Sequence, residues 1–191
     1  MKETQTCPWP SNNKLMIDYH DTEWGIPLHD DQKLFEFIVL DTFQAGLSWQ
    51  IVLNKRQGFR QALCNFEAQQ IALFDENKIN ELMLNAGIIR NKAKILATIG
   101  NAKGFLKIVE EYGSFDKYIW QFTKGVSIDN KLNSLTQMPV KSPESDAMSK
   151  ALISRGFKFV GSTICYAFMQ AAGMVNDHLT TCYKYKECSS E

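Results

Sequence analysis

The strongest constraint on the fold is a series of apolar stripes at helical spacing, each bounded by residues that cap helices. Asn91 begins a long stripe, and Gly113 ends it. Asp30 or Asp31 can cap another predicted helix. The apolar stripe of this helix is formed by Leu34, Phe35, Ile38, Val39 and Phe43. The strand candidate at 157–160 is short and isolated. The sequence therefore predicts an all-α fold.

Further boundary signals place more helices along the chain. Ser142 and Pro143 form a cap and first-turn pair for a helix that ends at Gly156. The segment 161–172 is apolar all round, so we expect a central buried helix there. The other predicted helices cover 47–56, a segment that begins at Asp75 and stops at Gly87, and a segment that begins at Ser114.

Size and composition fit a single domain covering residues 1–191. A chain of 191 residues with 45% hydrophobic and 22% charged residues builds an adequate core without disulfides. The 21 basic and 21 acidic residues cancel, so a nucleic-acid role has to rest on local charge.

The longest uncharged stretch, 159–176, is too polar and too short to span a bilayer, and the first 13 residues do not resemble a signal peptide. We therefore expect a cytoplasmic protein without a membrane partner. Motifs typical of nucleotide hydrolysis, Rossmann chemistry and serine hydrolysis do not occur.

Two cysteines and two histidines lie near the ends of the chain and could hold a metal ion. Cys7 and His20 are near the amino end, and His178 and Cys182 are near the carboxyl end. The last two are four residues apart, which would place them on one face of a helical turn. Such a set can form a closed tetrahedral zinc site with a structural role. The alternative is buried thiols with ordinary histidines.

A basic helical hairpin is the second candidate site. Gly87 lies at the turn between two predicted helices, where free backbone N–H groups and the helix dipole favour a phosphate. The segment 82–109 has no acidic residue, and its cations would attract a nucleic-acid backbone. The alternative is an ordinary solvated helix. The cations are Arg90, Lys92, Lys94, Lys103 and Lys107.

An aromatic and carboxylate cluster is the third candidate. Asp41 lies among apolar neighbours, and a buried carboxylate beside electron-rich rings suits a cationic aromatic ligand. The alternative is that the tryptophans belong to the core and Asp41 points to solvent. The aromatic members are Trp9, Tyr19, Trp24 and Trp49.

Five stretches between Cys7 and Cys182 resemble, in the same order, the DNA-3-methyladenine glycosylase I family. Together they cover nearly the whole chain. They are 19–25 (Tyr-His-Asp, then Glu-Trp-Gly), 44–49 (Gln-Ala-Gly-Leu-Ser-Trp), 85–94, 155–161 (Arg-Gly-Phe-Lys-Phe-Val-Gly), and 163–178 with its Thr-Ile-Cys-Tyr and Asn-Asp-His.

The resemblance implies an all-α helix-hairpin-helix DNA glycosylase fold with two helical lobes. The helix-hairpin-helix element would span about 76–108, with DNA-backbone contacts around Gly87, Ile88, Arg90 and Lys92. A structural Zn²⁺ would tie the termini, about 7–20 and 178–182. Its ligands would be Cys7, His20, His178 and Cys182.

The resemblance also assigns roles around the pocket. Tyr19 and Trp49 would stack a flipped base between them, and Leu47 would fill the gap left in the duplex. Trp24 and Trp9 would line the same pocket. Asp41 stands where the family has a glutamate that hydrogen-bonds the base, and Met16 stands where close relatives have a second tyrosine. The Asp41 carboxylate is one methylene shorter than a glutamate, which puts rate and selectivity in question. A catalytic group misplaced by about 1 Å can lower the reaction rate on the order of 100-fold.

The expected activity is hydrolysis of the N-glycosidic bond of 3-methyladenine in double-stranded DNA, by a monomeric enzyme without strand-cleaving activity. Two other hypotheses stay open at this point. One is a related protein that binds alkylated DNA but excises poorly because of Asp41 and Met16. The other is a zinc-stabilised helical protein with no role on DNA.

Overall fold

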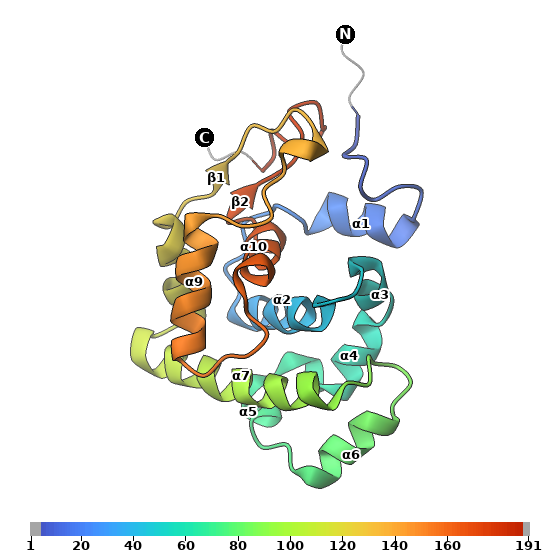
Figure 1. The fold of residues 1–191 in the computed structure, drawn as a ribbon, viewed down its shortest axis with the longest axis vertical. Helices are drawn as coiled ribbons and strands as arrows, with labels where there is room; N and C mark the ends of the chain where they lie inside the picture. The colour runs from blue at the N-terminus through green and yellow to red at the C-terminus, as the bar shows by residue number, and fades with distance from the viewer. Residues whose placement is uncertain (1–4, 189–191) are drawn as a thin grey trace.

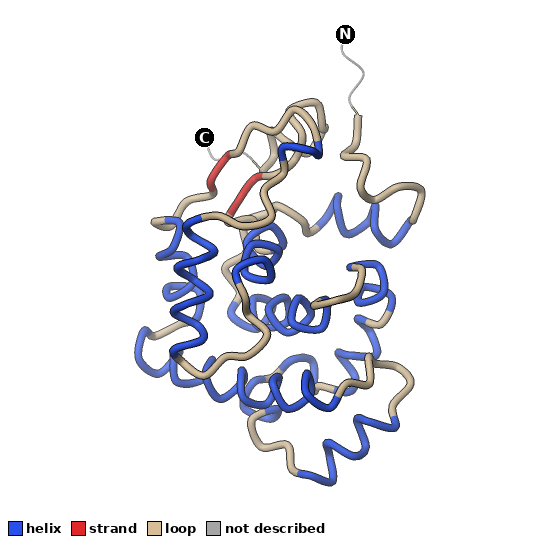
Figure 2. Tube along the Cα trace, in the orientation of Figure 1, coloured by secondary structure: helices blue, strands red, loops and turns tan. Residues whose placement is uncertain are grey.

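Helices make up nearly all the regular structure of residues 5–188, the part of the chain that the computed structural model describes (Figure 2). Within those residues, no helix is both long enough and apolar enough to cross a membrane. The helices are α1 (Lys14–Thr22), α2 (Asp31–Gln44), α3 (Trp49–Asn54), α4 (Arg56–Ala62), η1 (Cys64–Phe66), α5 (Ala68–Ile71), α6 (Glu76–Leu84), α7 (Lys92–Tyr112), α8 (Phe115–Trp120), η2 (Gln121–Thr123), η3 (Leu135–Gln137), α9 (Pro143–Ser154) and α10 (Ser162–Ala171).

The core is built around α2 and α10, which lie at the centre of the molecule (Figure 1). Every residue of α2 from Leu34 to Phe43 is buried. The predicted central helix at 161–172 is confirmed, because α10 packs against both α2 and α9. Around this pair, α7 runs below α2, and α1 and α3 lie on the side opposite α9 (Figure 1).

The predicted caps are present and explain where the main helices begin and end. The side chains of Asp30, Asp75 and Asn91 each accept a hydrogen bond from the backbone N–H three residues later. Ser142 forms a capping box ahead of Pro143. The C-cap of α7 is Gly113, with φ at +85°, a conformation that favours glycine.

The fold is mostly helical, as predicted, and differs from the sequence prediction in detail. β1 (Ile128–Asp129) and β2 (Val175–Asn176) form a short parallel pair, which depends on residues distant in sequence, and 157–160 forms no strand. The helix expected at 47–56 is interrupted at Lys55, whose backbone leaves helical geometry, and the chain continues as α4. Helices α1, α4 and α5 were not predicted.

Two glycines of α7 provide a matched test of this packing. A Cβ at Gly104 would lie 2.7 Å from the Phe157 ring and 3.0 Å from the Arg155 carbonyl oxygen, whereas a Cβ at Gly100 meets no atom within 4 Å. We expect Gly104→Ala to destabilise the protein by about 1–3 kcal/mol through overpacking. Gly100→Ala should stabilise it by about 0.5–1 kcal/mol through helix propensity. Urea unfolding measures the change in the free energy of unfolding for each variant. Equal changes for the two variants would contradict the packing described here.

Candidate active site

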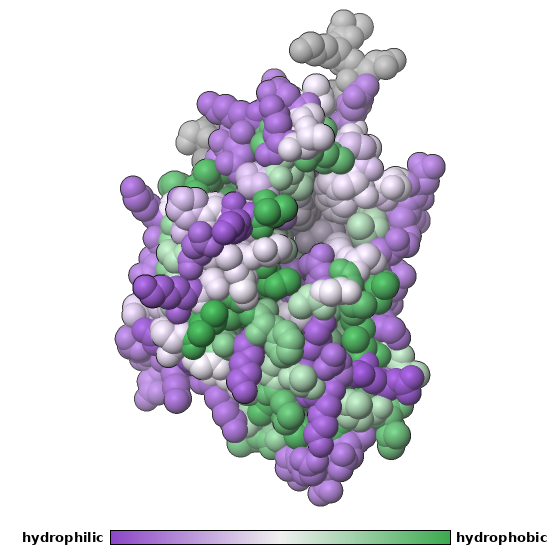
Figure 3. Space-filling model, viewed as in Figure 1, coloured by the Kyte–Doolittle hydropathy of each residue, from purple (hydrophilic) through white to green (hydrophobic). Residues whose placement is uncertain are grey.

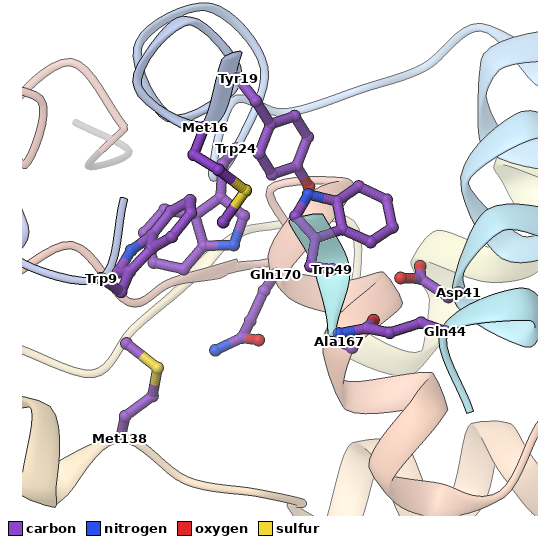
Figure 4. Close-up of a pocket in the computed structure, with 10 residues that line it drawn as sticks. All are labelled: Trp9, Met16, Tyr19, Trp24, Asp41, Gln44, Trp49, Met138, Ala167 and Gln170. Carbon is purple, nitrogen blue, oxygen red and sulfur yellow. The ribbon is translucent and has the colours of Figure 1, made fainter. Parts of the chain in front are cut away.

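An aromatic pocket opens between α1, the start of α3, and α10. The surface is hollowed at this place (Figure 3), and the close-up shows side chains from separate parts of the chain facing one another (Figure 4). The lining residues are Trp9, Met16, Tyr19, Trp24, Asp41, Gln44, Trp49, Met138, Ala167 and Gln170. All six residues predicted to form the base site therefore line one pocket, although no hydrophobic or charge pattern connects them in sequence.

The aromatic rings form a contiguous wall, which changes one predicted role. The ring centroids of Trp9 and Trp24 are 5.0 Å apart, and those of Tyr19 and Trp49 are 5.1 Å apart at an interplanar angle of 47°. A base stacked between two rings needs about 7 Å between them, twice the usual contact distance. A base therefore does not fit between Tyr19 and Trp49 in this arrangement.

Asp41 is buried in this pocket, so the alternative of a solvent-facing carboxylate is wrong. Its exposed fraction is 2%, and its Oδ2 has no hydrogen-bond partner among the described residues. Burial raises the pKa of this carboxyl well above its usual range. The same burial, with the nearby charge of Asp41, raises the pKa of the Tyr19 hydroxyl, so Tyr19 stays protonated. The pocket therefore offers an unpaired acidic group beside aromatic rings.

The Cys7, His20, His178 and Cys182 side chains meet in one buried cluster that could hold a metal ion. Their ligand atoms all lie within 4.8 Å of one another. Sγ of Cys182 is 3.6 Å from both the Nε2 of His20 and the Nδ1 of His178. A tetrahedral zinc site requires sulfur-to-nitrogen separations of about 3.5 Å. The predicted helical turn is absent, since His178 and Cys182 lie in a non-helical turn closed by the bond from the Cys182 N–H to the Leu179 carbonyl.

The hydrogen bonds around this cluster suit metal ligation. His178 would ligate through Nδ1, because its Nε2 is 3.1 Å from the Trp24 carbonyl oxygen. His20 would ligate through Nε2, because its Nδ1 is 2.7 Å from the Asp21 carboxylate. Partners of this kind fix the tautomer of metal-binding histidines. Hydrogen bonds from Cys7 and then from the two imidazoles lower the pKa of Cys182, which favours its thiolate, and the same contact between the two thiols raises the pKa of Cys7.

The loop 85–91 joins α6 to α7, at the place where the sequence predicts a hairpin. Arg90 and Lys92 are exposed, and Lys92 pairs with Glu76 at 3.0 Å. The exposed Gly87 donates its N–H to the Asn85 side chain at 2.7 Å. Ile88 is only 2% exposed, and its N–H donates to the Asn85 carbonyl oxygen at 3.4 Å, so the structure gives Ile88 a place in the core.

Lys94 does not belong to the exposed basic surface to which the sequence assigned it. It is 5% exposed, and its Nζ donates to the carbonyl oxygens of Phe43 and Ala45 at 2.8 and 2.6 Å. These carbonyls lie at the carboxyl end of α2, where a cation complements the helix dipole. Lys94 thus links the hairpin to the loop that presents Leu47, which is 39% exposed.

Comparison with known proteins identifies the family of this chain. The model of the methyladenine glycosylase family matches residues 9–185. The chain belongs to this family. The DNA-3-methyladenine glycosylase 1 of Escherichia coli (strain K12) is 45% identical over 181 residues, which cover 95% of this chain and 97% of the relative.

Solved structures of the family have the same fold. A crystal structure of a 3-methyladenine DNA glycosylase I is 47% identical to this chain, with a TM-score of 0.92 and coverage of 94% of this chain and 98% of the other. A second such enzyme, from Staphylococcus aureus, was solved to explain its recognition of 3-methyladenine. It is 31% identical, with a TM-score of 0.92 and coverage of 95% and 97%.

Sequence reasoning missed four of the pocket residues. Gln44 falls inside a stretch that carries the family resemblance, so that stretch could have indicated it. Gln170 is a polar residue in an otherwise apolar helix, which is a weaker signal of the same kind. Met138 and Ala167 carry no local signal, because they reach the pocket only through the tertiary fold.

The burial of Asp41 predicts a pH-dependent cost in stability. Because its pKa is raised in the folded state, stability falls as pH rises from the unfolded pKa, about 3.9, through the folded value. Asp41→Asn should therefore raise the melting temperature more at pH 8 than at pH 5, by an amount equivalent to about 1 kcal/mol or more. Asp18→Asn, at an exposed carboxylate, is the control and should change little. An Asp41→Asn effect independent of pH would contradict this interpretation.

Proposed function

We propose that this protein hydrolyses the N-glycosidic bond of 3-methyladenine in alkylated double-stranded DNA, releasing the base and leaving an abasic site. Membership of the methyladenine glycosylase family makes it a hydrolase of N-glycosidic bonds. The observation that carries the substrate assignment is the unpaired, buried carboxyl of Asp41 in an aromatic pocket. Such a site favours a flat, cationic base.

The chemistry of the substrate explains why so little catalytic machinery is needed. A base methylated at N3 is cationic while still attached to the sugar, so it is already a good leaving group. Asp41 would pair with this charge and accept a hydrogen bond, and the rings of Trp9, Trp24 and Trp49 would add cation–π attraction. Unmodified adenine lacks the charge and would gain neither contribution. We expect no strand cleavage, because none of the described residues that line the pocket is a lysine that could form a Schiff base with the sugar.

The hairpin and the loop beside the pocket would hold the DNA. The exposed Arg90 and Lys92 beside the loop 85–91 suit a phosphate, in the manner of a helix-hairpin-helix element. Leu47 is exposed next to the start of α3 and would occupy the space left by the flipped base. We further propose that residues 1–191 act as one domain and as a monomer. We place the enzyme in the cytoplasm, where bacterial DNA lies.

The Cys7, His20, His178 and Cys182 cluster would hold a structural Zn²⁺. Two thiols and two imidazoles, all buried, with ligand atoms at tetrahedral spacing, form the donor set of a closed zinc site. With four protein ligands, the ion would have no position for water, so its contribution would be to join the two ends of the chain. It would also fix Trp24, whose carbonyl bonds His178.

Base release measures the proposed activity directly. We expect the wild-type protein to release 3-methyladenine from methylated duplex DNA, and Asp41→Asn to slow release by about 100-fold or more. Asp41→Glu restores the residue typical of the family and should retain activity within about tenfold. Chromatography of the released base in single-turnover experiments provides the rates. The same preparations are compared for binding to the methylated duplex.

The result separates an enzyme from a lesion-binding protein. Release by the wild-type protein supports the enzyme, with Asp41 in the role of the family glutamate. If only Asp41→Glu releases base while both proteins bind methylated DNA, the native chain is a binding protein or acts on another base, and the proposal is wrong.

The zinc proposal predicts a metal-dependent fold at the termini. Purified protein should contain one zinc ion per chain, and Cys182→Ala should lose it together with about 3 kcal/mol or more of stability. Cys64→Ala, outside the cluster, is the matched control and should keep the metal. Elemental analysis with thermal unfolding tests both variants. Full stability of the wild-type protein after complete removal of metal would contradict a structural ion.

A further inference from the structure

A buried carboxylate outside the proposed catalytic chemistry lies directly behind the pocket. Asp177 follows β2 and is 1% exposed. Its Oδ2 accepts hydrogen bonds from the Tyr166 hydroxyl at 2.9 Å and from the Gln170 Nε2 at 2.7 Å. Its Oδ1 accepts one from the Asn130 Nδ2 at 2.6 Å. Three donors thus surround one acceptor group, and one of them, Gln170, lines the pocket.

This arrangement fixes the orientation of the Gln170 amide. A carboxylate only accepts hydrogen bonds, so Gln170 has to turn its NH₂ group toward Asp177. Its Oε1 is then held on the other side and makes no hydrogen bond with any described residue. In Figure 4 the oxygen of Gln170 is on the side of Gln44 and Asp41, and the nitrogen is on the opposite side.

We propose that Gln170 is a specificity-determining residue that accepts a hydrogen bond from the exocyclic amino group of the bound base. The proposal rests on the function proposed above. In a nucleotide of 3-methyladenine, the N–H donors of the base are the two hydrogens of the amino group at C6. Among the residues that line the pocket, Asp41 has an oxygen without a partner, and Gln170 has an oxygen whose direction is fixed. In the proposed complex, each of the two would accept one of these hydrogens.

The same arrangement would disfavour guanine. A guanine base carries a carbonyl oxygen at C6, which would face the Gln170 oxygen without a hydrogen between them. A glutamine without a partner could avoid this repulsion by rotating its amide by about 180°, so that its NH₂ group faced the guanine oxygen. In Gln170 that rotation would direct the amide oxygen at the Asp177 carboxylate. Gln44 makes no hydrogen bond with the described residues that would hold its amide in the same way. Asp177 therefore acts as a positioning residue for Gln170, and the pair favours methylated adenine over methylated guanine.

Binding of free bases to the metal-loaded full-length protein tests this inference. Gln170→Met keeps the length of the side chain and removes the acceptor. We expect it to weaken binding of 3-methyladenine about tenfold, the usual effect of one lost hydrogen bond, and to leave 3-methylguanine unchanged or tighter. Quenching of tryptophan fluorescence measures both dissociation constants. Gln170→Leu is a second variant that lacks the acceptor, should Gln170→Met fail to fold.

Tyr166→Phe is the matched structural control. Like Gln170→Met, it removes one donor from Asp177, but it leaves the Gln170 contact in place. It should lower stability without changing the ratio of the two dissociation constants. An unchanged ratio in the Gln170 variants, or the same change in Tyr166→Phe, would overturn the inference.

Base release from methylated DNA by the wild-type protein is measured in parallel. Absence of release contradicts the proposed function, whereas an unchanged binding ratio in the Gln170 variants contradicts this inference alone. The two failures are thus distinguishable.

Discussion

A carboxyl group held inside an aromatic pocket without a partner is the constraint around which this site is organised. Asp41 lies on α2 between the buried Leu40 and Phe43, so the helix cannot rotate the carboxyl toward water without exposing its core face. The packing of α2 offsets the free-energy cost of this buried carboxyl, and a bound cation would remove it. Under the proposed function, selection of a cationic base and instability of the empty site would have one physical origin, as is common where function conflicts with stability.

The pocket around this carboxyl is assembled from distant parts of the chain. The Cys and His cluster joins the two ends of the chain, and the contact of His178 with the Trp24 carbonyl connects that cluster to the pocket wall. On the other side, Lys94 connects the hairpin to the end of α2. The proposed DNA contacts at the loop 85–91 would therefore lie close to the loop that carries Leu47. The position of the bound base and the contacts with the DNA backbone would therefore depend on each other.

The sequence predicted the features that depend on local chemistry. Caps such as Asp30 and Asn91 act within one turn, so helix boundaries could be identified from neighbouring residues. The Cys and His cluster and the aromatic cluster with Asp41 were candidates from residue type and position, and the family resemblance assigned their roles and added Met16. The structure brings each group together.

The features that sequence reasoning missed depend on distance. Charge alone placed Lys94 on the surface, because the carbonyls that it binds are 49 and 51 residues away. The roles given to Tyr19 and Trp49 were inferred from the family resemblance, which does not give the distance between the two rings. In this structure the rings contact each other, with no space for a base between them. The fixed amide of Gln170 requires Asp177, which comes from the segment after α10 rather than from the same helix.

The most direct test of the central claim is the pH profile of single-turnover base release from methylated duplex DNA by the wild-type protein and Asp41→Asn. Because burial raises the pKa of Asp41, and only the ionised carboxylate pairs with the cationic base, the wild-type rate should rise with pH and then level off. Asp41→Asn should be slow and show no such rise. Equal rates for the two proteins across the profile would contradict the account.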